Sequence, residues 1–193
     1  LVIDIGGGTT EVAVVSLGGV VESESIKTAG DAFDEAIVRY VRRKHNILIG
    51  KRTAEELKIG IACLVPRAEV GIQEVKGRCL TTGLPKSVKI SSVELVEAIA
   101  EPARDILETI HMVLERTPPE LVSDVAQNGI VMAGGGSLIY GFDQLVEKDT
   151  GIRTTVVDDA LSCAAFGSGK MLMNLNDMPE GMVNLARKRQ MKA

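Results

Sequence analysis

The chain has 193 residues, a length that fits one domain or two small ones at about 150 residues per domain. Apolar residues make up 45% and charged residues 25%, and these ordinary globular values exclude a disordered or low-complexity chain. A net charge of −4 argues against a protein that coats nucleic-acid phosphates, so no nucleic-acid partner is expected. Only 3% of the residues are aromatic, which predicts a core of aliphatic side chains.

The start of the chain predicts a buried strand followed by a hairpin. Residues 1–5 form an apolar run that ends at consecutive glycines. Residues 11–17 and 20–26 predict two strands, which Gly18-Gly19 joins as a two-residue turn. Because the chain enters its first strand at Leu1 with no lead-in, we expect a fragment whose N-terminal part is missing.

The middle of the chain predicts two helices and a small antiparallel strand group. Asp31 is the expected N-cap of the first helix. Thr53 begins the second helix, and Thr53 and Glu56 have the spacing of a capping box. Residues 69–76 and 78–90 alternate in polarity and predict the strands.

The longest predicted helix covers residues 92–116, where apolar residues recur at helical spacing. Ser91 and Glu94 form a second capping box, and Pro102 predicts a kink or break near Glu101.

The last part of the chain alternates helices and strands. A short helix ends at Asn128-Gly129, and residues 130–133 predict a short buried strand. Consecutive glycines follow that strand and lead into a helix that continues to about Lys148. Residues 152–157 predict another strand, and residues 160–175 another helix.

These elements predict an α/β fold with an inserted region. Both glycine-rich turns lie in the flanks, so residues 1–29 and 93–175 are expected to form one core α/β subdomain. Residues 30–92 would be a smaller inserted subdomain, and residues 176–193, which lack periodicity, a poorly ordered tail.

Cysteine and histidine offer little sign of catalysis or metal binding. The three cysteines, Cys63, Cys79 and Cys163, lie far apart without a CxxC motif, which favours reduced thiols over a disulfide framework or a zinc site. His45 and His111 lie on predicted helices and are interpreted as surface or structural groups.

Two glycine-rich turns are the candidate functional elements. In each, a buried strand leads into consecutive glycines, Gly6 to Gly8 and Gly134 to Gly136. Glycine lets a backbone approach a ligand closely, and its N–H groups can then bind phosphate oxygens. Asp4 would sit at the strand end, where a carboxylate can hold the water shell of Mg²⁺.

Other phosphate-binding motifs are excluded, but a purely structural interpretation stays open. The first turn fails the dinucleotide fingerprint, because Glu11 stands at its last position and a strand follows where a helix is needed. No GxxxxGK[ST] motif is present. Each turn alone could be a tight turn without a ligand.

The sequence around both turns resembles the actin and heat-shock chaperone ATPase superfamily. Residues 4–11 are similar to its second phosphate loop, and residues 130–137 to its adenosine motif. Within that superfamily the chain resembles the MreB family of bacterial actin-like cell-shape proteins, in segments 30–37, 40–43, 53–58, 116–121 and 158–164. The resemblance implies an actin-like ATPase fold, of which this chain is the second lobe, with a ribonuclease-H-like core and a smaller inserted α+β subdomain.

The resemblance also implies a bound nucleotide and its contacts. The residues that it implies for ATP are Gly6, Gly7, Gly8, Thr9, Thr10, Glu55, Glu56, Leu57, Lys58, Gly134, Gly135, Gly136 and Ser137. Thr10 and Glu11 would act on the attacking water, and Asp4 would hold Mg²⁺ through water. Glu55 and Lys58, which the resemblance places against ribose and adenine, would otherwise be an exposed ion pair.

In function, the resemblance implies an ATP-binding protein that polymerises head to tail into filaments and hydrolyses ATP slowly. Such filaments would lie in the cytoplasm against the inner membrane and organise cell-wall synthesis, with cell-wall synthesis proteins as partners. The isolated chain, without a first lobe, is expected to have negligible ATPase activity. The alternative is a structural or filament-capping module that does not hydrolyse ATP. It rests on Gly60, which stands where the family usually has a glutamate that could bond the ribose, and on the first lobe that is expected to be missing.

Overall fold

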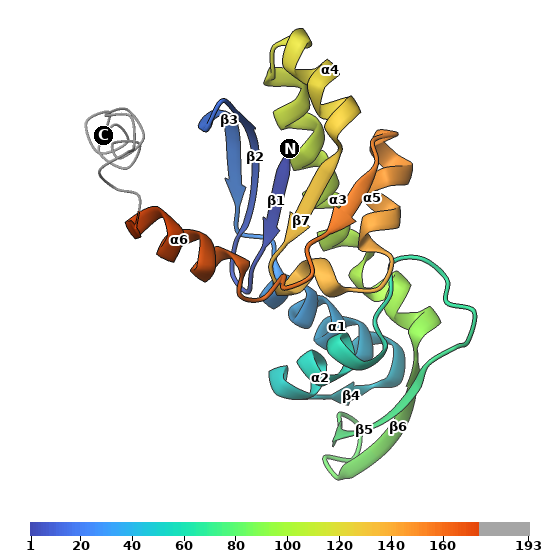
Figure 1. The fold of residues 1–193 in the computed structure, drawn as a ribbon. Helices are drawn as coiled ribbons and strands as arrows, with labels where there is room; N and C mark the ends of the chain where they lie inside the picture. The colour runs from blue at the N-terminus through green and yellow to red at the C-terminus, as the bar shows by residue number, and fades with distance from the viewer. Residues whose placement is uncertain (174–193) are drawn as a thin grey trace, which may run out of the picture.

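The structure is a computed structural model that describes residues 1–173. Its larger sheet has five strands in the order β3-β2-β1-β7-β8 (Figure 1). The bounds of these strands are β1 Val2–Ile5, β2 Thr10–Ser16, β3 Gly19–Ile26, β7 Ile130–Ala133 and β8 Thr154–Val156. The first three strands pair antiparallel, whereas β1, β7 and β8 run parallel. The mixed α/β fold predicted from the sequence is confirmed.

The hairpin between β2 and β3 forms one residue earlier than predicted. Leu17 and Gly18 occupy the turn with φ values of 49° and 76°, and Gly19 already belongs to β3. Two successive positive φ values are the geometry whose twist matches a two-residue hairpin. Leu17 adopts a positive φ although it is not glycine. The predicted turn at Gly18-Gly19 is therefore wrong by one residue.

Helix α3 (Ser92–Arg116) covers the larger sheet by packing on β2 and β3. The predicted capping box is confirmed, because the Ser91 hydroxyl accepts the Glu94 amide and the Glu94 carboxylate accepts the Ser91 amide. A break at Pro102 is wrong, since the helix runs through that residue. Ile99 and Ile106 on either side of it are buried in the same core.

The smaller sheet, in the order β4-β5-β6, lies at the far end of the molecule beyond α1 and α2 (Figure 1). Its strands are β4 Ile47–Leu48, β5 Ile72–Cys79 and β6 Pro85–Ser91, and the helices are α1 Gly30–His45 and α2 Lys51–Ile61. All five elements fall between residues 30 and 92, the range expected to form the inserted subdomain.

Both predicted helix caps in this region are wrong. Helix α1 begins at Gly30 after Ala29, and the amides of Gly30 and Asp31 donate to the carbonyls of Gly6 and Gly7 at 3.0 and 2.7 Å. The first glycine turn therefore satisfies amides that a side-chain cap would otherwise bond. Helix α2 begins at Lys51 after Gly50, so Thr53 lies inside it and cannot cap it.

The remaining helices lie on both sides of β7 in the chain, one before it and three after it. They are α4 Pro119–Asn128, the 3₁₀ helix η1 Gly135–Leu138, α5 Phe142–Thr150 and α6 Cys163–Met173. The helix expected to follow the second glycine turn is two helices, because Gly141 takes a left-handed conformation at φ 78° between them. The predicted tail, 176–193, lies outside the described residues.

The core is aliphatic, as predicted, with a small aromatic contact at its centre. Ten of the twelve largest fully buried side chains are Ile or Leu, and the other two are Phe33 and Phe142. Their rings meet edge to face at 6.1 Å, so α1 and α5 share one core although they are far apart in sequence. No helix in residues 1–173 has the length and apolar character needed to cross a membrane.

The parallel pairing of β1 with β7 brings the two glycine turns together. Asp4 pairs with Ala133, so both strands end at the same edge of the sheet. The second turn then packs against the first strand: a Cβ on Gly134 would overlap the Ile5 carbonyl oxygen, and one on Gly136 would overlap the Ile5 side chain. Only glycine fits at these two positions.

Replacing Ser91 by Ala should lower the free energy of unfolding by about 1 kcal/mol, because it removes the N-cap of the longest helix. The matched control is Ser123→Ala, which loses only an exposed bond to the Pro119 carbonyl and should change stability by less than about 0.5 kcal/mol. Urea unfolding measures both values. Equal stabilities for the two variants would contradict the role of the cap.

Replacing Gly134 by Ala should destabilise the fold by about 2–5 kcal/mol, because it combines strain at φ 80° with overlap on Ile5. Gly7→Ala is the control from the other turn, where a Cβ meets no atom within 4 Å and φ is not positive. It should stay within about 1 kcal/mol of the parent. Thermal unfolding of both variants tests this difference, and a stable Gly134→Ala protein would refute the close approach.

Candidate functional site

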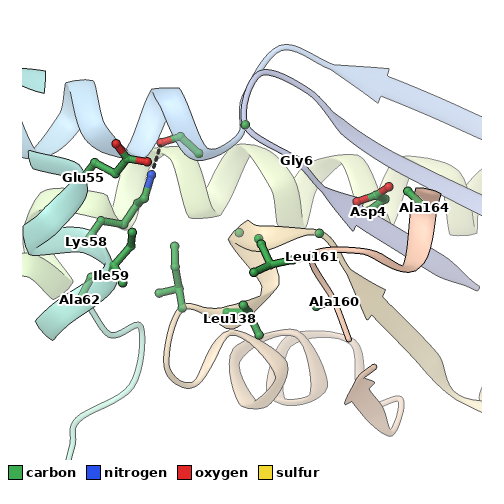
Figure 2. Close-up of a pocket in the computed structure, with 16 residues that line it drawn as sticks. Asp4, Gly6, Glu55, Lys58, Ile59, Ala62, Leu138, Ala160, Leu161 and Ala164 are labelled. Atoms are coloured by element: carbon green, nitrogen blue, oxygen red, sulfur yellow. Dashed lines mark hydrogen bonds between the residues drawn. The ribbon is translucent and has the colours of Figure 1, made fainter. Parts of the chain in front are cut away.

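A cavity of about 570 Å³ opens where the two glycine turns meet helix α2 (Figure 2). This volume lies within the range of small-molecule sites, roughly 300–1,000 Å³. Its position also follows the general rule that ligands bind beyond the carboxyl ends of the strands in open α/β sheets. The lining residues are Asp4, Gly6, Gly7, Gly30, Glu55, Lys58, Ile59, Ala62, Gly134, Gly135, Gly136, Leu138, Ile139, Ala160, Leu161 and Ala164.

The glycine turns form one wall of the cavity with bare backbone. Gly7 lines the cavity and is exposed, and an added Cβ there would enter open space. Two other turn amides are already bonded within the protein, since Gly6 donates to the Thr9 carbonyl and Gly134 to the Ala160 carbonyl, both at 2.9 Å. The turns therefore offer close backbone approach to a ligand, but the amides of Gly6 and Gly134 are not free donors.

Helix α2 supplies the charged wall. Glu55 and Lys58 lie one helical turn apart, and both line the cavity. The ammonium of Lys58 lies 2.8 Å from Asp34 and donates to the Gly30 carbonyl at 3.0 Å. The other two residues predicted on this helix face elsewhere: Glu56 pairs with Arg52 at 3.2 Å, and Leu57 is buried in the core.

Asp4 is the acidic group of the glycine wall. It is partly exposed at the end of β1 and lines the cavity on the side opposite α2 (Figure 2). Within residues 1–173 no three acidic, histidine or cysteine side chains gather as a direct metal site. A single carboxylate fits an ion such as Mg²⁺, which keeps most of its water shell and binds through few protein ligands.

The structure does not bring the two expected catalytic residues to the cavity wall. Thr10 is fully buried, and its hydroxyl donates to the Thr28 carbonyl at 2.6 Å. Glu11 is exposed on β2, the next position along the strand. At the start of β2, Thr10 pairs with Ile5 and Glu11 pairs with Asp4, so both residues lie beside the end of β1, but neither is among the residues that line the cavity.

Three other predicted ligand residues also lie outside the wall. Gly8 and Thr9 are exposed beyond it, and Ser137 is buried with its hydroxyl donating to the Gly134 carbonyl at 2.7 Å. Ser137 thus closes the second turn from within.

Sequence reasoning missed the apolar half of the cavity. Ile59, Leu138 and Leu161 line it, and all three are exposed, with Ile59 76% and Leu161 73% accessible. Large apolar side chains left open to solvent in a recess are typical of a ligand site. The available signal was Leu138, which lies two residues after the last glycine of the second turn. Gly60, the departure noted above, does not line the cavity; its missing side chain would meet Gln73.

The cysteines and histidines take no part in this site. All three cysteines are free, in agreement with the predicted reduced thiols. His45 pairs with Glu94 at 2.7 Å and His111 with Asp149 at 2.6 Å, which fits the structural roles predicted for them.

The comparisons with known proteins agree with this architecture. A family model described as MreB/Mbl protein matches residues 1–180. The cell shape-determining protein MreB of Escherichia coli K12 is 48% identical over 172 residues, which cover 89% of this chain and 50% of that protein.

Among solved structures, MreB5 of Spiroplasma citri bound to ADP matches with a TM-score of 0.88 at 39% identity, over 90% of this chain and 53% of that one. The same protein has also been solved bound to AMPPNP. A MamK double helical filament matches with a TM-score of 0.68 at 28% identity, over 82% of this chain and 49% of that one.

The chain therefore spans about half the length of the relatives that it matches. The match extends over nearly all of it and includes both glycine turns and the cavity between them. The protein belongs to the MreB/Mbl family of cell shape-determining proteins and has the fold of their actin-like structural neighbours.

Proposed function

We propose that this chain supplies one wall of an ATP site in an actin-like, filament-forming protein. The observation that carries the proposal is the cavity in which two bare glycine turns face the Glu55 and Lys58 side chains of α2. A relative with 39% identity, MreB5 of Spiroplasma citri, is bound to ADP in one structure and to AMPPNP in another, which supports a nucleotide as the ligand.

The cavity is divided in a way that suits the parts of a nucleotide. Phosphates would lie along Gly7 and the second glycine turn, where backbone can approach without side chains. Asp4 would hold Mg²⁺ through its water shell, and the bound ion would neutralise phosphate charge. The base would lie in the apolar part near Leu138 and Ile59, with Glu55 beside it.

Binding and hydrolysis have different requirements in this chain. In-line attack of water on a terminal phosphate depends on groups that position the water and stabilise charge. The Thr10 hydroxyl is already bonded to Thr28, and Glu11 is off the cavity wall. We therefore propose that the chain binds the nucleotide, and that slow hydrolysis needs the other half of the whole protein.

Self-association is the second part of the proposal. MamK, a structural neighbour, forms a double helical filament, and a head-to-tail contact that does not close generates such assemblies. By family membership the whole protein would form filaments in the cytoplasm against the inner membrane and work with cell-wall synthesis proteins.

A non-hydrolysing structural or capping module is the alternative function. The positions of Thr10 and Glu11 favour it, whereas Gly60 does not, because that residue faces Gln73 instead of the cavity. Phosphate release by the whole protein separates the two functions.

Titration of the chain with Mg-AMPPNP in a calorimeter should show saturable binding, and Gly7→Asp should weaken it by about tenfold or more. The added carboxylate would enter open space beside the phosphates and repel them. Gly50→Asp is the control, since it makes the same charge change at the N-cap of α2, away from the cavity. Absence of heat from the parent chain would refute the nucleotide site, and equal affinities for both variants would refute its phosphate position.

Joined to the first half of Escherichia coli MreB, the chain should pellet in the presence of Mg-ATP and release phosphate slowly. The same fusion carrying Gly7→Asp should remain in the supernatant, because the nucleotide no longer supports assembly. Sedimentation and phosphate release measure these outcomes. Pelleting without phosphate release would favour the structural alternative. Equal pelleting with and without nucleotide would contradict the coupling of assembly to nucleotide binding.

A further inference from the structure

Lys58 lines the cavity, but its ammonium group points toward the start of α1. The Nζ atom lies 2.8 Å from Asp34 Oδ1 and donates to the Gly30 carbonyl at 3.0 Å, a bond drawn in Figure 2. The two side chains are 13% and 3% exposed, so this is a buried ion pair. Two of the three donors of the ammonium are therefore directed into the protein.

Asp34 depends on this lysine. Among the residues that the structure describes, Lys58 is the only polar partner of the buried Oδ1 atom. Burial raises the pKa of Asp34, and Lys58 opposes that rise. A buried ion pair is weak evidence for a gain in stability, since desolvation offsets the attraction, so its role must be sought in what it positions.

The pair is connected directly to the first glycine turn. The carbonyl of Gly30 accepts from Lys58, and the amide of Gly30 donates to the Gly6 carbonyl at 3.0 Å. The next amide, that of Asp31, donates to the Gly7 carbonyl at 2.7 Å. The backbones are also in contact, because a Cβ on Gly30 would lie 3.2 Å from the Gly6 oxygen.

We infer that Asp34 and Lys58 are positioning residues that fix the Gly6–Gly7 turn through Gly30. In this role Lys58 supports phosphate binding indirectly, because it holds the turn that would contact the phosphates. This role replaces the direct contact with ribose and adenine that was expected for Lys58. The inference rests on the proposed nucleotide site. If Lys58 acts through the turn, its loss should weaken binding of a ligand with phosphates but not of one without them. A direct contact of Lys58 with ribose or base would weaken binding of both ligands.

A second ion pair provides a matched control. Lys51 on α2 pairs with Asp31 on α1 at 2.9 Å, so it joins the same two helices with the same residue types. Its side chains are 59% and 56% exposed, and exposed pairs contribute little. Lys51→Met therefore reproduces the charge change of Lys58→Met without the buried link to Gly30.

The first test compares AMPPNP with adenosine in calorimetric titrations of the full chain. Lys58→Met should weaken Mg-AMPPNP binding by about tenfold or more and adenosine binding by less than about twofold, while Lys51→Met changes neither. An equal loss for both ligands would show a direct contact with ribose or base and overturn the inference. If the parent chain binds neither ligand, the proposed function fails, and the second test decides the inference alone.

The second test needs no nucleotide. Amide exchange measured by NMR should be about tenfold or more faster at Gly30 and Asp31 in Lys58→Met than in the parent chain or in Lys51→Met. The double variant Asp34→Asn/Lys58→Met removes both charges, so it guards against a failure to fold caused by an unpaired Asp34. Fast exchange at these two amides in a double variant with parental thermal stability supports a positioning role. Parental exchange rates in either folded variant would overturn it.

Discussion

The parallel pairing of β1 with β7 is the constraint on which the candidate site depends. Residues 2–4 pair with residues 131–133, so two segments that lie far apart in sequence end at one edge of the sheet. The second glycine turn then lies directly against Ile5, at a distance that leaves no room for a Cβ on Gly134 or Gly136. A shift of this register would separate the turns and remove the cavity wall that they share.

The first glycine turn also stabilises the start of helix α1. Its carbonyls accept the first amides of α1, which leaves α1 without a side-chain cap and binds the small-sheet region to the strand end. The buried pair of Asp34 and Lys58 extends this contact to α2. The Gly30 backbone thus connects Lys58 of α2 to the first glycine turn.

The chemistry of the cavity is asymmetric in a way that fits half of a nucleotide site. One side offers backbone and a single carboxylate, and the α2 side offers Glu55 and Lys58 together with the exposed Ile59. The groups that would act on an attacking water are not on these walls, since Thr10 is bonded to Thr28. This division agrees with a chain that spans about half of its relatives, in a family whose member MreB5 is found with ADP or AMPPNP.

Local signals in the sequence predicted what depends on neighbouring residues. The capping box at Ser91, the glycine turns after two buried strands, and the shared face of Glu55 and Lys58 all follow from spacings of a few residues. The segments similar to the MreB family identified the family and the fold, because their order along the chain is specific. The capping box and the shared helix face were correct because each is fixed by short-range geometry.

Tertiary structure decided which side chains reach the cavity and which polar groups remain free. Asp31 and Thr53 resemble helix caps, yet the glycine turn caps α1 and Gly50 precedes α2. Thr10 and Ser137 carry suitable hydroxyls, but both are buried and bonded to backbone. Burial and hydrogen bonding depend on contacts between distant segments, and the spacing of residues along the chain does not contain them.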